Sequence, residues 1–176
     1  VPLVVHEQNA VPGLTNRLLS RFAAETLVGF EGAMPGGVWV GNPVRTAITE
    51  LPSPEERYAT RRGPLRVLVL GGSQGALSLN QDLPELLLAA LGNHLEVRHQ
   101  CGAHREDEAA PVYRALGLKA RVSEFIEDMA EAYGWADLVV CRAGALTVAE
   151  VAAAGVAALF VPLPTAVGDH QTLNAR

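Results

Sequence analysis

The residues with the clearest chemical potential lie in the stretch Ala136–Gly155, ADLVVCRAGALTVAEVAAAG. The pattern predicts a buried strand, a turn of small residues and a helix that begins beneath that turn. Such a helix leaves the backbone N–H groups of Ala145, Leu146 and Thr147 without partners inside the helix, and helix starts of this kind attract anions. Glu150 follows about one helical turn later and could accept hydrogen bonds from ligand hydroxyls. Phosphate-binding amides beside an acceptor for a diol indicate a nucleotide.

A second candidate for phosphate binding is the loop Gly71–Gly75, GGSQG, which follows an apolar run. Its glycines permit close backbone approach and Ser73 adds a hydroxyl, although a plain glycine turn before a helix is the alternative. The loop is neither a GxGxxG fingerprint nor a P-loop. An NAD site would also need an acid near the end of the next strand, which instead reads His99-Gln100-Cys101 and counts against NAD.

Single polar residues elsewhere could complete a ligand site. Arg45 could reach a cleft between domains as a cation for a pyrophosphate, or could simply be solvated. Asn9, at the end of a predicted strand, could contact a ligand or serve as a turn residue. Glu150 could be a surface carboxylate, but its apolar neighbours on the helix indicate that the carboxylate has a hydrogen-bond partner, for which a ligand hydroxyl would serve. The polar run Asp169–Thr172 could bind sugar hydroxyls or cap a helix.

The elements that must position these residues alternate regularly from residue 65 onward. Apolar strands separated by helices predict a parallel sheet covered on both faces, an α/β fold of the doubly wound kind. Ligands of such sheets bind beyond the carboxyl ends of the strands. We expect strands at Leu65–Leu70, Leu95–Cys101, Arg121–Phe125, Asp137–Cys141 and Ala157–Val161, and helices at Ala76–Leu91, His104–Leu116, Glu127–Trp135 and Leu146–Ala154, with Pro111 interrupting the second helix.

The preceding residues read as the end of another domain. Short apolar runs predict strands at Pro2–His6, Thr26–Phe30 and Val38–Val40, with a helical pattern after Pro12-Gly13. Gly41-Asn42-Pro43 breaks the pattern, and the charged, proline-bearing segment up to residue 63 is typical of a connection. We therefore expect one domain to end at residue 43 and a second to occupy residues 44–176. Both ends of the chain are abrupt, which suggests a piece of a longer protein.

Composition excludes several classes of function. The 14 basic and 19 acidic residues give a net charge of −5 and no general reason to expect nucleic-acid binding. The five histidines show no metal-ligand spacing, no nucleophile elbow is present, and the two cysteines read as reduced thiols. We expect no metal and no cofactor. No apolar run approaches the roughly 20 residues of a transmembrane helix, so membrane contact should be peripheral.

Several blocks of the sequence together resemble one family. They are HEQNAVPGLTNR (6–17), GNPVR (41–45), VLGGSQGALSLNQ (69–81), EFIEDMAEAYGWADLVVCRAGALTVAEVAAAG (124–155) and DHQTLNAR (169–176). In this order they are similar to the MurG family of bacterial peptidoglycan glycosyltransferases, which transfer N-acetylglucosamine (GlcNAc) from UDP-GlcNAc to the undecaprenyl-linked muramoyl acceptor, lipid I, to give lipid II. One departure is Ala143, where many relatives have serine.

The resemblance implies a GT-B architecture, with two Rossmann-like domains facing across a cleft and the UDP-sugar held mainly by the second. It implies that Ile126 offers its backbone to the uracil and that Glu150 holds the ribose hydroxyls. The diphosphate would meet Ser73, Arg45 and the helix amides, and GlcNAc or the reacting centre would meet Gln171 and Asn9. The full substrate-binding set is Asn9, Arg45, Ser73, Ile126, Ala145, Leu146, Thr147, Val148, Ala149, Glu150 and Gln171.

The resemblance also implies an inverting transfer at the cytoplasmic face of the inner membrane, with membrane contact made by residues that precede Val1. The catalytic base would lie there too, so the fragment itself should be inactive. Two alternatives stay open at this point. One is a UDP-GlcNAc 2-epimerase of the same fold, which eliminates and re-adds UDP without an acceptor. The other is a module that only binds a UDP-sugar.

Overall fold

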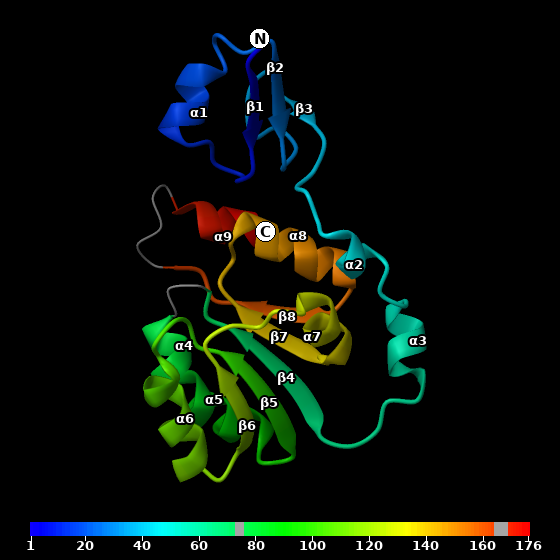
Figure 1. Cartoon of the computed structure of the whole chain (residues 1–176), viewed down its shortest axis with the longest axis vertical. Coiled ribbons are helices and arrows are strands. Elements are labelled where there is room, and N and C mark those ends of the chain that lie inside the picture. The colour runs from blue at the N-terminus through cyan, green and yellow to red at the C-terminus, as the bar shows by residue number, and fades with distance from the viewer. Residues whose placement is uncertain (73–75, 164–168) are drawn as a thin grey trace.

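The computed structural model describes residues 1–72, 76–163 and 169–176, which form two parallel sheets joined by an extended segment (Figure 1). The first sheet contains β1 (Val4–Glu7), β2 (Glu25–Val28) and β3 (Val38–Trp39), with α1 (Leu14–Leu19) beside it. The connection carries α2 (Thr46–Thr49) and α3 (Pro54–Ala59). The second unit contains β4 (Leu65–Leu70), α4 (Leu77–Gln81), α5 (Leu83–Leu91), β5 (Leu95–Gln100), α6 (Glu106–Ala115), β6 (Lys119–Ser123), α7 (Met129–Trp135), β7 (Leu138–Cys141), α8 (Ala145–Ala154), β8 (Ala157–Phe160) and α9 (His170–Asn174).

The strand order of the second sheet is β6-β5-β4-β7-β8, and every neighbouring pair is parallel. The chain leaves β4 toward β5 on one side and later returns to β7 on the other, which makes the β4–β7 boundary the switch point of the sheet. The register sets Leu70 opposite both Gln100 and Cys141. The carboxyl ends of the three central strands therefore meet at one level.

Alternate residues of β4 face two separate cores, so helices cover both faces of the sheet. Val67 and Val69 pack in a cluster with residues of α4, α5 and α6. Leu68 and Leu70 pack in a second cluster with residues of α2, α7 and α8. All four side chains are buried, which is why residues 67–70 of β4 are all apolar, whereas Arg66 near the start of the strand is only partly buried. The doubly wound parallel sheet predicted from the sequence is confirmed.

Several expected elements differ from the structure, and the helices expected from residues 104 and 127 begin two residues later, at Glu106 and Met129. The single helix predicted over residues 76–91 is wrong, because the helix breaks at Asp82 into α4 and α5 where Pro84 lacks an N–H donor. The strand predicted at 121–125 begins two residues earlier, at Lys119. Pro111 does not interrupt α6 but lies inside it.

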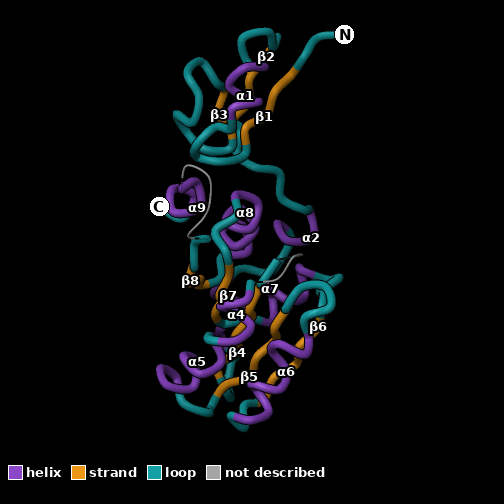
Figure 2. The backbone as a smooth tube through the Cα atoms, turned by 90° about the vertical axis from the view of Figure 1, so that its left-hand side faces the viewer, coloured by secondary structure: helices purple, strands orange, loops and turns teal. Residues whose placement is uncertain are grey.

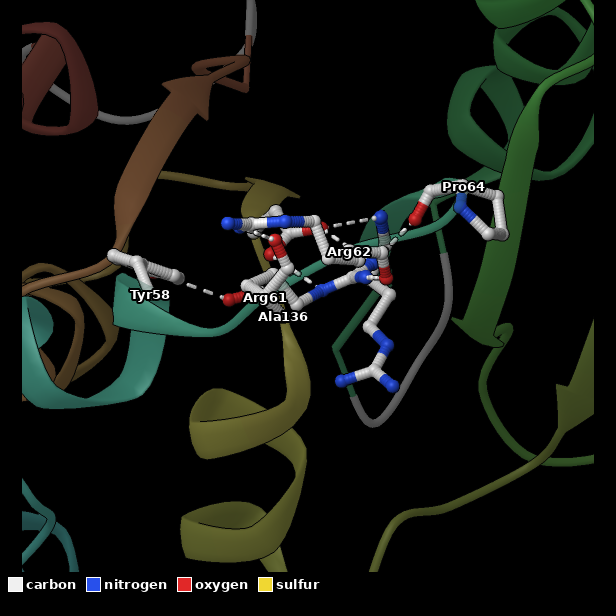
Figure 3. A network of polar contacts seen from close by, with 7 residues as sticks. Tyr58, Arg61, Arg62, Pro64 and Ala136 are labelled. Carbon is white, nitrogen blue, oxygen red and sulfur yellow. Dashed lines mark hydrogen bonds and ion pairs between the residues drawn. The ribbon is translucent and has the colours of Figure 1, made fainter.

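The connection between the sheets is fastened to the second unit. Ile48 of α2 is buried in the second core, and the Tyr58 hydroxyl donates to the Ala136 carbonyl at 3.2 Å. Arg61 forms an ion pair with Asp137 at 2.9 Å and also donates to the Arg62 and Pro64 carbonyls; Figure 3 shows the labelled members of this network around the start of β7. The expected division between residues 43 and 44 remains a prediction.

Helices α8 and α9 lie between the first sheet and the second, as both views show (Figures 1 and 2). Asn174 of α9 is buried and connects the two units: its side chain accepts from the Ala10 N–H at 2.9 Å and donates to the Ala143 carbonyl at 3.1 Å. Among the described residues, no helix combines the length and the apolar character that crossing a bilayer requires.

Candidate functional site

A pocket of about 230 Å³ opens at the switch point of the second sheet, between the carboxyl ends of β4 and β7. Strand ends, the loop before α7, the first turns of α8 and the connection before α2 all contribute to its wall. This is where open α/β sheets bind ligands. The lining residues are Arg45, Leu70, Gly72, Gln100, Phe125, Ile126, Met129, Tyr133, Cys141, Arg142, Thr147 and Glu150.

Glu150 has protein partners on both carboxylate oxygens. Arg45 donates to Oε1 from Nε at 3.0 Å and from Nη2 at 2.7 Å, across 105 residues of sequence. The Tyr133 hydroxyl donates to Oε2 at 3.1 Å. The expectation that an acid on this apolar helix has a partner is therefore met within the protein, by an arginine and a tyrosine.

Tyr133 is fully buried, and its environment keeps the phenol protonated. Burial raises the pKa of the Tyr133 hydroxyl well above its usual range, and the neighbouring Glu150 carboxylate raises it further. A neutral phenol can only donate to the carboxylate, so the direction of this hydrogen bond is fixed. Cys141, also in the pocket wall, has its pKa raised to about 12 by burial, and its thiol is not a nucleophile at neutral pH.

Gln100 fixes the start of the glycine loop at the pocket edge. Its side-chain N–H donates to the Gly72 carbonyl at 3.1 Å, and its oxygen accepts from the Gly72 N–H at 3.2 Å. A third bond runs from the side chain to the Glu124 carbonyl at 3.3 Å. One amide thus joins the loop after β4 to the loop that carries Ile126.

A second, open hollow of about 730 Å³ adjoins this pocket and shares Gly72, Arg142 and Thr147 with it. Gln171 of α9 also lines it and accepts from the Leu163 N–H at 2.9 Å. Arg142 spans this wall, donating to the Val161 and Pro162 carbonyls at 3.1 and 3.2 Å and to the Ser78 hydroxyl at 3.1 Å. The two hollows together offer space for a ligand with more than one part.

The start of α8 lies beneath the junction of the two hollows. Gly144 is its extended N-cap residue and supplies no side-chain acceptor for the amides of Ala145, Leu146 and Thr147. The helix runs for ten residues and ends at Gly155, whose φ of 59° is the left-handed conformation that glycine allows. The anion-attracting end of the helix dipole is thus directed at the shared wall.

Asn9 lies on the other unit, in a turn held by a buried carboxylate. Glu7 accepts from the Asn9 and Gly13 N–H groups at 2.9 and 3.0 Å and from the Asn16 side chain at 2.9 Å. Burial alone would raise the pKa of Glu7, but these hydrogen bonds outweigh it, so the pKa lies below its usual range. The Asn174 side chain donates to the Asn9 oxygen at 3.2 Å, which ties the turn to α9.

The structure therefore brings four expected residues, Arg45, Ile126, Thr147 and Glu150, into one pocket and places Gln171 in the hollow beside it. Thr147 is flanked on α8 by the other expected residues of that helix, Ala145, Leu146, Val148 and Ala149. Asn9 lies on the first unit, where it contacts Asn174 of α9. Ser73 lies outside the described residues. Within the described ranges, no group of three or more His, Cys, Asp and Glu side chains could hold a metal ion.

Sequence reasoning missed three residues that shape the pocket: Tyr133, Gln100 and Arg142. Tyr133 looks like an ordinary core residue at helical spacing, and no local pattern marks its contact with Glu150. Gln100 could have been found from the sequence, because a polar residue at the end of a buried strand needs a hydrogen-bond partner. Arg142 could have been found in the same way, because it is a charged residue directly after the buried strand β7.

Comparison with known proteins agrees with this geometry. The chain is 77% identical over its whole length to a protein of Alcanivorax borkumensis and 58% identical over 99% of its length to one of Xanthomonas axonopodis pv. citri. Both bear the name UDP-N-acetylglucosamine--N-acetylmuramyl-(pentapeptide) pyrophosphoryl-undecaprenol N-acetylglucosamine transferase. The chain covers 50% and 41% of these proteins, so it spans about half the length of the curated relatives it matches.

A crystal structure of Acinetobacter baumannii MurG superposes with a TM-score of 0.83 at 45% identity, over 99% of this chain and 50% of that one. This similarity confirms the GT-B architecture expected from the resemblance. Residues 66–176 match the model of the glycosyltransferase family 28 C-terminal domain. The chain therefore belongs to glycosyltransferase family 28, and the resemblance to MurG noted from the sequence is confirmed.

Proposed function

We propose that this chain carries the donor site of an inverting glycosyltransferase that moves GlcNAc from UDP-GlcNAc to the 4-hydroxyl of the muramoyl sugar in lipid I, giving lipid II. The observation that carries the proposal is the pocket at the switch point, where Arg45, Ile126, Thr147 and Glu150 converge. The names of the relatives supply the donor and the acceptor. The relatives are about twice as long, so acceptor binding and the catalytic base are assigned to the length that the chain does not span.

Each part of the donor has a counterpart in the two hollows. The Ile126 backbone meets the uracil, and Glu150 accepts from the ribose hydroxyls. The amides at the start of α8, Arg45 and Ser73 surround the diphosphate. Gln171 and, from the facing unit, Asn9 contact the GlcNAc. Val148 and Ala149 support the wall formed by α8.

In the reaction, the 4-hydroxyl oxygen attacks the anomeric carbon while the bond from that carbon to the UDP oxygen breaks. The hydroxyl proton goes to a base, UDP leaves from the opposite face and the new linkage is β. Negative charge grows on the leaving diphosphate in the transition state. The helix amides and Arg45 stabilise that charge most when it is largest, which is the differential binding that catalysis requires.

We also propose that the protein works at the cytoplasmic face of the inner membrane as a peripheral protein, because its acceptor is a membrane lipid. Binding of the membrane is assigned to the length outside this chain. We expect residues 1–176 to bind UDP without catalysing transfer by themselves. Measurable turnover by the purified fragment would contradict that expectation.

Kinetics of the full-length enzyme test the proposal. Arg45→Ala should lower kcat by about 100- to 1,000-fold, the usual cost of losing one donor to a developing anion. Glu150→Ala should act chiefly by raising the KM for UDP-GlcNAc. Arg105→Ala and Glu131→Ala, which break surface ion pairs elsewhere, are the controls. Unchanged kinetics for both pocket variants would refute the site.

The product distinguishes transfer from epimerisation. Incorporation of radiolabelled GlcNAc into the lipid-linked acceptor supports the proposal. An epimer has the same mass as UDP-GlcNAc, so the nucleotide sugars are separated by chromatography and assigned by NMR. Finding only a new UDP-sugar, with or without acceptor, would instead favour a 2-epimerase.

A further inference from the structure

The two oxygens of the Glu150 carboxylate are held by groups of different kinds. Oε2 accepts one hydrogen bond from the Tyr133 hydroxyl at 3.1 Å. Oε1 accepts two from the Arg45 guanidinium, at 2.7 and 3.0 Å. An ionised carboxylate has about four acceptor positions, and these three bonds leave one of them open. The proposed function needs two, one for each ribose hydroxyl, so one of these partners must give way when a nucleotide binds.

Tyr133 is the partner that cannot leave. Its side chain has no exposed surface and packs in the second core with Leu68 of β4 and Val151 of α8. Toward the ionised carboxylate its neutral phenol can only donate, and moving away would leave that O–H buried without an acceptor. The bond to Oε2 is therefore permanent and sets the orientation of the carboxylate.

Arg45 is the partner that can leave. Its side chain is 56% exposed, whereas that of Glu150 is 16% exposed, and Arg45 lies on the connection just before α2. Ion pairs with one such exposed member contribute little to stability, because water replaces the lost contact. Both side chains line the same pocket, so a freed guanidinium remains beside the bound ligand.

We propose that Tyr133 is a positioning residue for nucleotide binding, and that Arg45 occupies Glu150 Oε1 as a substitute for the ribose hydroxyls until a nucleotide displaces it toward the diphosphate. This inference rests on the proposed function. During the exchange the carboxylate gains ribose hydroxyls and the arginine gains phosphate oxygens, so neither charge stays unpaired in the pocket. A ligand with a ribose but no phosphate displaces Arg45 without offering it a new partner.

Arg45 is tested by titrating the full-length protein with uridine and with UDP in a calorimeter. Arg45→Ala should tighten uridine binding by about 1.5- to fivefold, because a surface ion pair no longer competes. The same variant should weaken UDP binding by about tenfold, because a charged donor to the diphosphate is lost. Arg105→Ala, whose ion pair with Glu108 is outside the pocket, should change neither affinity. Equal loss for both ligands, or no gain for uridine, would overturn the substitution role.

Tyr133 is tested with UDP and 2′,3′-dideoxy-UDP. Tyr133→Phe should weaken UDP binding by about three- to tenfold, because the carboxylate loses one hydrogen bond that orients it. Binding of the dideoxy ligand should not change. Tyr113→Phe removes the hydroxyl of another fully buried tyrosine, one that contacts His99 instead, and serves as the matched control. Equal loss for both ligands would overturn the positioning role.

Wild-type protein separates a failure of this inference from a failure of the proposed function. If wild type binds UDP and the dideoxy ligand with equal affinity, Glu150 does not hold the ribose. Both the inference and the proposed donor site then fail. If wild type prefers UDP but the two variants do not respond as stated, only the inference fails. A melting curve for each variant shows whether it is folded, and the Arg45 titrations need no change in the core.

Discussion

Two polar networks in the second unit each centre on one fully buried tyrosine, and they differ in what the tyrosine faces. Tyr113 contacts His99 Nδ1 at 3.0 Å, and Asn80 contacts His99 Nε2 at 3.1 Å, all three side chains being buried. Tyr133 contacts Glu150, whose other oxygen is bound by a half-exposed arginine at a pocket. The first network is closed around the His99 imidazole and meets a charge only at its edge, where Asn80 donates to the Glu108 carboxylate at 3.0 Å. The second is charged at its centre and open on one side.

A structural polar cluster differs from a binding one in how easily its hydrogen-bond partners can be replaced. In the closed network the imidazole has a buried partner on each nitrogen, so the protein itself uses its hydrogen-bonding capacity. In the open network a charged group is bound by a partner that solvent or ligand can replace at little cost. Substitutions should therefore change stability in the first and affinity in the second.

The largest effect concerns His99 and pH. Burial lowers the pKa of His99 to about 4, from an ordinary value of 6.5. The folded state favours the neutral ring, so its contribution is complete above pH 6.5 and is lost as pH falls from 6.5 toward 4. The free energy of unfolding should drop by about 3 kcal/mol over that range. Urea unfolding at a series of pH values measures it, and the slope between pH 6.5 and 4.5 should flatten in His99→Gln.

The next effect concerns the Tyr113 hydroxyl. Tyr113→Phe leaves a buried nitrogen of His99 without its partner and should lower the free energy of unfolding by about 1 to 3 kcal/mol. The affinity for UDP should not change. Urea unfolding and calorimetry on the same preparation measure the two quantities. A loss of UDP affinity with intact stability would remove the distinction between the networks.

The smallest effect concerns the Arg45–Glu150 pair as a contribution to folding. Because Arg45 is 56% exposed, Arg45→Ala should lower the free energy of unfolding by about 1 kcal/mol or less. Thermal and urea unfolding measure it beside Arg105→Ala. A much larger loss would mean that the pair is a fixed structural contact rather than one that a ligand can replace.

Much of the second unit could be predicted from the sequence, because the apolar runs of the central strands β4 and β7, alternating with helical patterns, leave few alternative folds. The errors occurred where local chemistry was given too little weight. Pro84 cannot donate to a helix, and it marks the break between α4 and α5. Gly117, with a φ of 66°, ends the turn after α6 and allows β6 to begin at Lys119.

The candidate site was predictable residue by residue but not as an arrangement. Arg45 and Glu150 were each singled out, yet their pairing depends on the connection packing α2 against α7 and α8. That packing is a tertiary contact, and no local pattern encodes it. Tyr133 was missed because its apolar ring explains its burial, while its hydroxyl acquires a role only through Glu150.

Glu150 is proposed to bind the ribose of a uridine nucleotide in this pocket. The most direct test is calorimetric titration of UDP into the wild-type protein and into Glu150→Gln, which keeps the shape of the side chain and removes its charge. We predict that the substitution weakens UDP binding by about 10- to 100-fold, since hydrogen bonds to a charged group are replaced by neutral ones. Equal affinity of the two proteins for UDP would contradict the account.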